Sequence, residues 1–271
     1  MPSVAKFIDL SRSHGLGKVA QVALGRELNR LFPGPLRSRI MPSLHELDQA
    51  AVETHRDAAS VLTSLGVDAG ISTEAQRVSE QASAWGVSHA RFPMNWGVEK
   101  ETATFLYEFI RAVRPQRVLE TGVANGTSSY VILSALSANG HGELVTTDIE
   151  PSIHGDMPEE LAARWTYVHL QDRTPERVMP GVFASHGPYD VYFHDADHSY
   201  LGQRFEYHQA WEHLLDGGWF LSDDIDFSTA WIEFTREKDL SPIHLVDGRK
   251  VLGVARKGAP LQLDVPRSAH P

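Results

Sequence analysis

Residues 118–127, which read Val-Leu-Glu-Thr-Gly-Val-Ala-Asn-Gly-Thr, decide the fold. A short apolar run ends at the acid Glu120, Gly122 and Gly126 follow, and residues 128–138 can form a helix. This order predicts a strand, a tight turn and a helix. Glycines let the backbone approach a ligand closely, and a helix start carries N–H groups without a partner inside the helix. The turn therefore predicts a bound small molecule, although its Glu-x-Gly-x-Ala-x-Gly spacing differs from the dinucleotide fingerprint.

Working outward toward the C-terminus, strands and helices alternate. Strands are predicted at residues 144–148, 166–170, 190–194 and 218–222, and helices at 158–163, 200–215 and 228–238. Residues 243–246 and 251–255 flank Asp247-Gly248, which is a hairpin signal. Repeated strand-helix units indicate a parallel sheet covered on both faces. The predicted fold class is α/β: a doubly wound, mostly parallel, seven-stranded Rossmann-like sheet with a helical N-terminal extension.

Working outward toward the N-terminus, residues 98–113 predict an amphipathic helix that Pro115 ends. Residues 1–90 are predicted to be helical without strands, with helices at 16–31, from Ser43 to Gly66 and from Thr73 to Gly86. We therefore predict a helical extension (1–90), a sheet domain (91–257) and a tail (258–271). The apolar faces of the N-terminal helices must bury against the sheet domain or another subunit, so a homo-oligomer through these helices is one expectation.

Composition excludes several classes of function. The 271-residue chain has 42% hydrophobic residues and no cysteine, which rules out disulfides, Cys-zinc sites and thiol nucleophiles. Its net charge of −10 argues against a nucleic-acid partner. We find no membrane-spanning stretch of about 20 apolar residues and no signal-peptide pattern, so we expect no membrane partner and a cytoplasmic location.

Ligands of such sheets bind beyond the C-terminal ends of the strands, so polar residues there are candidate site residues. An acid that ends the second strand suits a ribose, whose hydroxyls donate hydrogen bonds to a carboxylate; a helix N-cap is the alternative for that acid. The strand-end residues are Glu120, Gly122, Asp148, Gln171, Asp172, Asp195, Asp197, His198, Asp223 and Asp224.

The order of these motifs resembles the class I S-adenosylmethionine-dependent methyltransferases over about residues 98–256. The resemblance rests on the segments 118–126, 147–151, 193–200 and 221–224. It implies that the glycine loop holds the methionine part of the cofactor, that the acid after the second strand holds its ribose, and that a later acid lies near the adenine. The implied cofactor-binding residues are Glu120, Gly122, Gly126, Asp148 and Asp172. Ala124 stands where many members have glycine, and needs a compatible backbone angle.

The later acids look more specifically like those of the metal-dependent O-methyltransferases, including the catechol type and those of antibiotic biosynthesis. Three carboxylates at two neighbouring strand ends repel one another and favour a divalent cation, and Mg²⁺ prefers oxygen ligands. The implied metal ligands are Asp195, Asp223 and Asp224, although a turn-capping role explains any one of these acids. Asp197 and His198 are both candidates to accept the proton of the substrate, and the sequence does not choose between them.

The leading hypothesis is an S-adenosylmethionine-dependent O-methyltransferase that acts on a hydroxyl of a small molecule, with Mg²⁺. One alternative is a nicotinamide-dependent oxidoreductase on the same kind of sheet, which the missing Gly-x-Gly-x-x-Gly disfavours. Another is a non-catalytic cofactor-binding or assembly protein.

Overall fold

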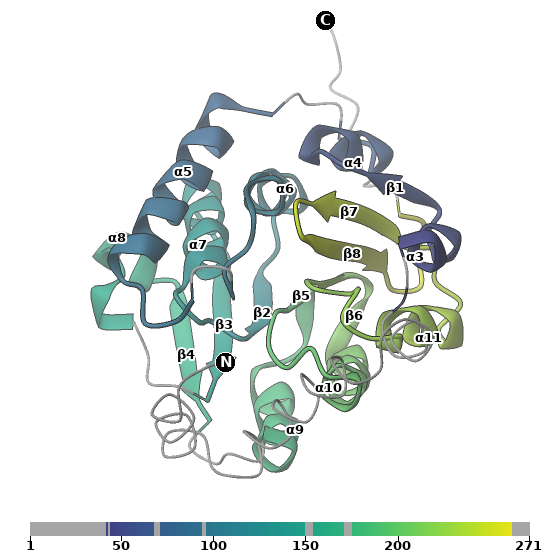
Figure 1. Ribbon diagram of the computed structural model, residues 1–271. Helices are drawn as coiled ribbons and strands as arrows, with labels where there is room; N and C mark the ends of the chain where they lie inside the picture. The colour runs from purple at the N-terminus through teal and green to yellow at the C-terminus, as the bar shows by residue number, and fades with distance from the viewer. Residues whose placement is uncertain are drawn as a thin grey trace, which may run out of the picture.

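A computed structural model describes residues 42, 44–67, 71–93, 96–149, 154–170 and 175–261. Within these residues eight strands form one sheet, in the order β1-β7-β8-β6-β5-β2-β3-β4 (Figure 1). All neighbouring pairs are parallel except those of β8, which runs antiparallel to both β6 and β7. The strands are β1 (Glu53–His55), β2 (Arg117–Thr121), β3 (Glu143–Asp148), β4 (Trp165–His169), β5 (Tyr189–His194), β6 (Leu214–Ser222), β7 (Ile243–Asp247) and β8 (Lys250–Arg256).

Helices cover both faces of the sheet, as the alternation of strands and helices predicts. Successive residues of β2 show the two faces, because Val118 packs into one hydrophobic cluster and Leu119 into the other. One face carries α4 (Ala58–Ser64), α5 (Thr73–Ser88), α6 (Lys100–Val113), α7 (Thr127–Asn139) and α8 (Glu159–Ala162). The other carries α3 (Leu44–Ala50), α9 (Pro175–His186), α10 (Tyr200–His213) and α11 (Ala230–Glu237) (Figure 1). The doubly wound Rossmann-like fold is confirmed.

The prediction of one helix from Ser43 to Gly66 is wrong, and so is that of an N-terminal region without strands. Helix α3 ends at Ala50, and β1 then pairs in parallel with β7 and forms the edge of the sheet. Helix α4 then begins, and Asp57 is its N-cap because its side chain accepts a 2.8 Å hydrogen bond from the Ser60 backbone N–H. A three-residue strand is too short to show an alternating pattern of apolar and polar residues. Its partner β7 also lies about 190 residues away in the chain, so the sequence near β1 does not indicate the pairing. Within the described residues the sheet therefore has eight strands, where the sequence predicts seven.

Most other elements lie where the sequence predicts them, with ends shifted by at most four residues. The second N-terminal helix is capped by Ser72, whose side chain accepts a 3.0 Å hydrogen bond from Ala75 N, so the cap precedes the predicted Thr73. Helix α9 has no counterpart in the prediction, since Pro180 within it breaks the expected helical pattern. The predicted helix at 16–31 lies outside the described residues.

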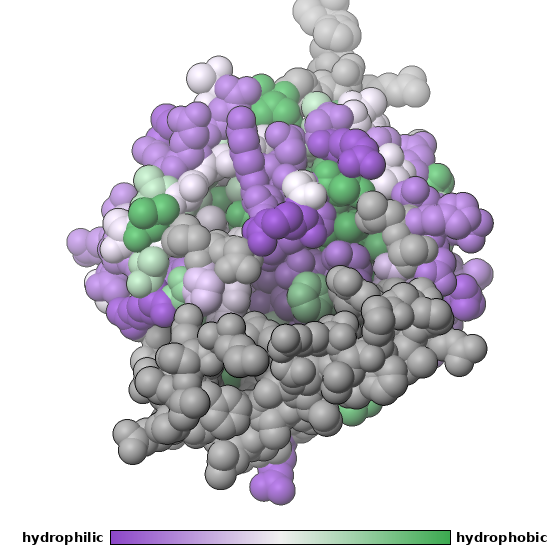
Figure 2. Space-filling view, in the orientation of Figure 1, coloured by the Kyte–Doolittle hydropathy of each residue, from purple (hydrophilic) through white to green (hydrophobic). Residues whose placement is uncertain are grey.

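Helices α4 and α5 bury their apolar faces against the sheet domain, where they share one core with α6 and α7. Hydrophilic side chains accordingly dominate the surface over these two helices (Figure 2). The helices within residues 58–88 thus bury their apolar faces against the sheet domain. Association into a homo-oligomer through the N-terminal helices stays a prediction. The division at residues 90 and 257 is likewise a prediction, although β1 adds residues of the first region to the sheet. No helix in the described part of the chain is long and apolar enough to span a membrane.

The strand order reverses direction between β2 and β5. From β2 the chain adds β3 and then β4 on one side, and it returns to place β5 on the other side. The segments that leave the C-terminal ends of β2 and β5 therefore diverge. Such a switch point is where open α/β sheets bind ligands, and it brings the glycine loop beside Asp195.

Candidate active site

Gly122 brings the first and fourth predicted strand ends together. Its φ is +86°, and a Cβ at this position would lie only 2.0 Å from the backbone oxygen of Asp195. The backbone N–H of Asp195 in turn donates a 2.8 Å hydrogen bond to Thr121 O. Gly122 is therefore required for close packing of the protein's own loops, a reason that differs from the predicted approach to a ligand.

Glu120 is a fully buried acid beneath this loop. Its Oε2 accepts a 2.5 Å hydrogen bond from Ser129 Oγ, and its Oε1 has no hydrogen-bond partner among the described residues. Burial raises the pKa of Glu120 to about 8 in spite of the hydrogen bond from Ser129. An unpartnered buried carboxylate oxygen is costly unless a ligand satisfies it, and a cationic group is the natural partner.

Gly126 and Ala124 complete the loop with left-handed backbone angles, φ +77° and +45°. Gly126 is the N-cap of α7 and gives no side-chain cap, so the first N–H groups of that helix are left for a ligand. Ala124 adopts the left-handed φ that a glycine would adopt at this position. Because alanine rarely adopts this φ, the backbone there carries strain.

Asp148, at the end of β3, holds the same loop from the opposite side. Its Oδ2 accepts hydrogen bonds from the backbone N–H groups of Val123 (2.7 Å) and Ala124 (3.1 Å). This contact of Asp148 with the glycine loop was predicted neither by its ribose role nor by the alternative role as a helix N-cap. The ribose role stays a prediction, and Asp172, the predicted residue near the adenine, lies outside the described residues.

Asn125 is a residue that the sequence analysis missed. Its buried amide accepts hydrogen bonds from the backbone N–H groups of Arg91 (2.9 Å) and Phe92 (3.0 Å), and donates one to Phe92 O (3.1 Å). Arg91 also forms a 3.0 Å ion pair with Asp156, beyond β3. The segment before α6 is therefore tied to the glycine loop, which follows β2, and to the segment after β3.

Asp195, His198 and Asp224 form a cluster at the ends of β5 and β6. One possible ligand atom from each lies within 4.8 Å of the other two. His198 Nε2 is 3.6 Å from Asp195 Oδ1 and 3.4 Å from Asp224 Oδ2. Burial alone lowers the pKa of His198, but the two carboxylates outweigh it and raise that pKa to about 9. Asp224 has a left-handed φ of +50°, so this strand end also carries backbone strain.

The side chain of Asp223 contacts Lys250. Its Oδ2 lies 2.7 Å from Lys250 Nζ, and the same ammonium is 3.2 Å from Asp224 Oδ2. The side chains of Asp223 and Lys250 are 0% and 5% exposed, and Asp223 Oδ1 has no partner among the described residues. Of the three predicted metal ligands, the structure thus brings Asp195 and Asp224 together with His198, while Asp223 pairs with a lysine. Its role as a ligand stays a prediction.

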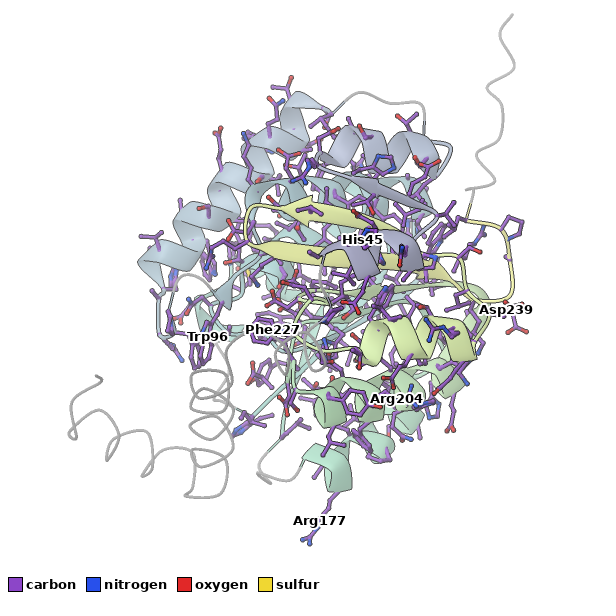
Figure 3. The ribbon with its side chains drawn as sticks, turned by 45° about the vertical axis from the view of Figure 1, so that its right-hand side comes forward. His45, Trp96, Arg177, Arg204, Phe227 and Asp239 are labelled. Carbon is purple, nitrogen blue, oxygen red and sulfur yellow. The ribbon has the colours of Figure 1, made fainter. Side chains whose placement is uncertain are left out.

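The two candidate bases lie in different surroundings. Asp197 is exposed, and its Oδ1 accepts a 3.1 Å hydrogen bond from Ser199 N at the start of α10. His198 faces the acid cluster. Beside it, 5.7 Å between ring centroids, lies the ring of Phe227, which is 51% exposed on the loop after β6 (Figure 3). An exposed phenylalanine gives the cluster an apolar rim, which the sequence analysis did not anticipate.

These observations test whether the residues fit the implied groups. The unpartnered oxygen of Glu120 and the uncapped start of α7 suit a ligand that carries both an ammonium and a carboxylate, as a methionine moiety does. The carboxylates of Asp195 and Asp224, with a buried unpartnered oxygen of Asp223 nearby, suit a divalent cation, and the imidazole of His198 beside them is left to act as a base. Both groups fit.

A family model described as "Methyltransferase domain" matches residues 119–225, which run from the glycine loop to the acid cluster. Rv0187 from MTB, solved with its cofactor, is 18% identical, with 81% of this chain and 99% of that chain covered and a TM-score of 0.54. PaMTH1 from Podospora anserina, bound to SAH, is 16% identical, with 74% and 95% covered and a TM-score of 0.52.

The O-methyltransferase from Bacillus cereus in complex with SAH is 15% identical, with 73% of this chain and 97% of that chain covered and a TM-score of 0.50. At these identities the likeness shows the fold. No curated protein matches the sequence significantly.

Residues 119–225 match the methyltransferase-domain family, and this match together with the fold supports the class I S-adenosylmethionine-dependent methyltransferases as the class of protein. Its methyltransferase domain includes the glycine loop, Asp148 and the acids that follow β5 and β6. The resemblance seen in the sequence is confirmed, and the nicotinamide-dependent oxidoreductase is set aside.

Proposed function

We propose that the protein transfers a methyl group to a hydroxyl oxygen of a small molecule, using S-adenosylmethionine and a divalent metal, with Mg²⁺ as the first candidate. The observation that carries this proposal is the cluster of Asp195, His198 and Asp224 at the switch point, next to the glycine loop. A methyl transfer to oxygen needs an acceptor hydroxyl that loses its proton close to the bound methyl donor. The cluster supplies oxygen ligands and a base in one place.

S-adenosylmethionine supplies an electrophilic methyl group on a sulfonium, and a divalent metal supplies a Lewis acid that lowers the pKa of an acceptor hydroxyl. The chain's own residues bind and orient these groups. Glu120 is proposed to accept the ammonium of the methionine moiety, Gly126 and the start of α7 to hold its carboxylate, and Asp148 to hold the ribose. Gly122 lets the glycine loop lie against Asp195, so that the donor and the acceptor sites adjoin.

His198 is the better supported base. It faces both Asp195 and Asp224, whereas the carboxylate of Asp197 is engaged at the start of α10. In the proposed step the acceptor oxygen bonds to the methyl carbon as the carbon–sulfur bond breaks. The hydroxyl proton passes to Nε2 of His198, which must first lose its own proton because its pKa is raised to about 9. Asp195 and Asp224 are proposed to hold the metal, and the exposed ring of Phe227 to contact an apolar part of the acceptor.

Titration calorimetry tests the cofactor assignment. We expect S-adenosylmethionine to bind and NAD not to bind, each measured with and without Mg²⁺. Binding of NAD in preference to S-adenosylmethionine would overturn the proposal.

Turnover then tests the chemistry. With a panel of small hydroxylated acceptors, we expect production of S-adenosylhomocysteine that stops in excess EDTA and returns with Mg²⁺. Asp224→Asn should abolish turnover while leaving the affinity for S-adenosylmethionine nearly unchanged, because the proposed cofactor ligands follow β2 and β3. Full activity in excess EDTA would show that the metal part of the proposal is wrong.

A further inference from the structure

Lys250 is a buried cation at the candidate metal site that the proposed function does not use. It is the first residue of β8, which runs antiparallel to β6, so it lies beside the residues that follow β6. The backbone hydrogen bond from Ile225 N to Val251 O, 3.1 Å, joins the two segments at this point. Its side chain is 5% exposed, and its Nζ is 2.7 Å from Asp223 Oδ2 and 3.2 Å from Asp224 Oδ2.

The charges of the site show what this lysine does. Asp195, Asp223 and Asp224 carry a formal −3 when ionised, and the ammonium of Lys250 reduces this to −2, which one divalent cation neutralises. The ammonium lies within ion-pair distance of two of these carboxylates, 2.7 Å from Asp223 Oδ2 and 3.2 Å from Asp224 Oδ2, so it is placed to offset their charge. Without Lys250, three buried acids would face one another with no fixed counter-ion.

The geometry shows a second effect. Asp223 Oδ2 accepts a hydrogen bond from the ammonium, and the group within mutual ligand distance is Asp195, His198 and Asp224, without Asp223. The ammonium also contacts one oxygen of Asp224, which restricts how that carboxylate can turn toward a ligand.

We propose that Lys250 is a positioning residue and resident counter-cation of the metal site, which keeps Asp223 out of the ligand set and limits the affinity of the site for divalent cations. This inference rests on the metal site of the proposed function and adds a determinant of its charge and ligand geometry. A lysine that only stabilised the fold would lower stability when replaced and leave metal affinity unchanged.

The test uses the full chain, freed of metals, with Mn²⁺ alone as the probe. Binding is measured by titration calorimetry and by the loss of the electron paramagnetic resonance signal of free Mn²⁺. The variants are Lys250→Met, which removes the charge and keeps much of the side-chain volume, and the double variant Asp223→Asn with Lys250→Met, which keeps a net −2. The matched control is Lys257→Met, since Lys257 is also largely buried but donates to the backbone oxygens of Trp211 and Leu214.

We expect Lys250→Met to bind Mn²⁺ about tenfold or more tightly than the unmodified protein, because a nearby positive charge has been removed. The double variant should return to within about threefold of the unmodified protein, and Lys257→Met should not differ from it. Thermal unfolding gives a second measure: metal-free Lys250→Met should melt lower than the unmodified protein and gain more from added Mn²⁺. Should Lys250→Met fail to fold, Lys250→Gln, which still donates a hydrogen bond, is expected to show the same direction.

The outcomes separate this inference from the proposed function. Equal Mn²⁺ affinity in the unmodified protein and in Lys250→Met would overturn the role of Lys250 and leave the metal-dependent function standing. If Lys250→Met binds Mn²⁺ and the unmodified protein does not, the role of Lys250 as the resident cation is supported and the metal requirement of the proposed function is overturned. Binding by neither would overturn the inference, because a cluster of three acids without its ammonium should take up a cation; the cofactor calorimetry then decides the methyl transfer on its own.

Discussion

The side-chain amide of Asn125 makes two hydrogen bonds to the backbone of Phe92, accepting from its N–H at 3.0 Å and donating to its carbonyl oxygen at 3.1 Å. Phe92 also stacks on Trp96, with 5.4 Å between ring centroids. Asn125 lies in the glycine loop, 33 residues from Phe92 in the chain. One buried amide therefore couples the proposed cofactor loop to an aromatic segment on a different element.

Replacing Asn125 with Ala should weaken both stability and cofactor binding. Loss of three hydrogen bonds should cost about 2 to 3 kcal/mol of unfolding free energy, at roughly 1 kcal/mol each. We also expect the affinity for S-adenosylmethionine to fall, measured by calorimetry, since the glycine loop loses its tie to the segment before α6.

The control is Asn139→Ala at the other end of α7, where the buried amide donates to Ile110 O at 2.9 Å. This variant should lose stability and keep its cofactor affinity. If the two asparagine variants change cofactor affinity equally, the coupling has no functional role.

Gly122→Ala should be far more damaging than Gly140→Ala. Both glycines have positive φ, +86° and +74°, so both substitutions carry backbone strain of about 1 to 2 kcal/mol. A Cβ at Gly122 would in addition lie 2.0 Å from Asp195 O, while one at Gly140 meets nothing within 4 Å. Urea unfolding should show a loss of about 3 kcal/mol or more for Gly122→Ala. Equal losses would mean that the loops beyond β2 and β5 are not packed as described.

Glu120→Gln should change how stability depends on pH. The folded-state pKa of Glu120, about 8, lies above the ordinary value of 4.5, so the unfolded chain releases this proton first. The folded protein therefore loses stability as pH rises from about 4.5 toward 8, by at most roughly 1.4 kcal/mol for each pH unit. Glutamine does not titrate, so the unfolding free energy of the variant should rise relative to that of the unmodified protein as pH rises. Unfolding free energies measured in urea between pH 5 and 8 check this, and parallel curves would contradict it.

Asp148→Ala should weaken the binding of S-adenosylmethionine by about tenfold or more. The change removes a carboxylate proposed to accept hydrogen bonds from the ribose, and charge-assisted bonds contribute roughly 1.5 to 3 kcal/mol each. It also removes the acceptor of the Val123 and Ala124 N–H groups, which loosens the glycine loop. Calorimetry with adenosine separates the two effects, since adenosine has the ribose and lacks the methionine part. Unchanged affinity for both ligands would rule out the ribose assignment.

The sequence by itself determined the central strand, the glycine turn and the acids at successive strand ends. These features are local: an apolar run, residues suited to a turn and a polar residue after each strand lie within a few positions of one another. The alternation of strands and helices then implied a covered parallel sheet and a ligand site at its C-terminal edge, and the structure shows the sheet and places Asp148 and Asp195 against the glycine loop.

Only the tertiary structure decided which of these residues meet. Asp223 and Lys250 are 27 positions apart, and nothing near either residue indicates that they pair. The same holds for Asn125 with Phe92, and for β1 with β7. The pairing of Asp223 with an ammonium depends on where the antiparallel strand β8 places Lys250, and the group within mutual ligand distance is Asp195, His198 and Asp224. Residue type and spacing indicate which groups reach the edge of the sheet, whereas charge pairing among segments distant in the chain determines which group each one faces.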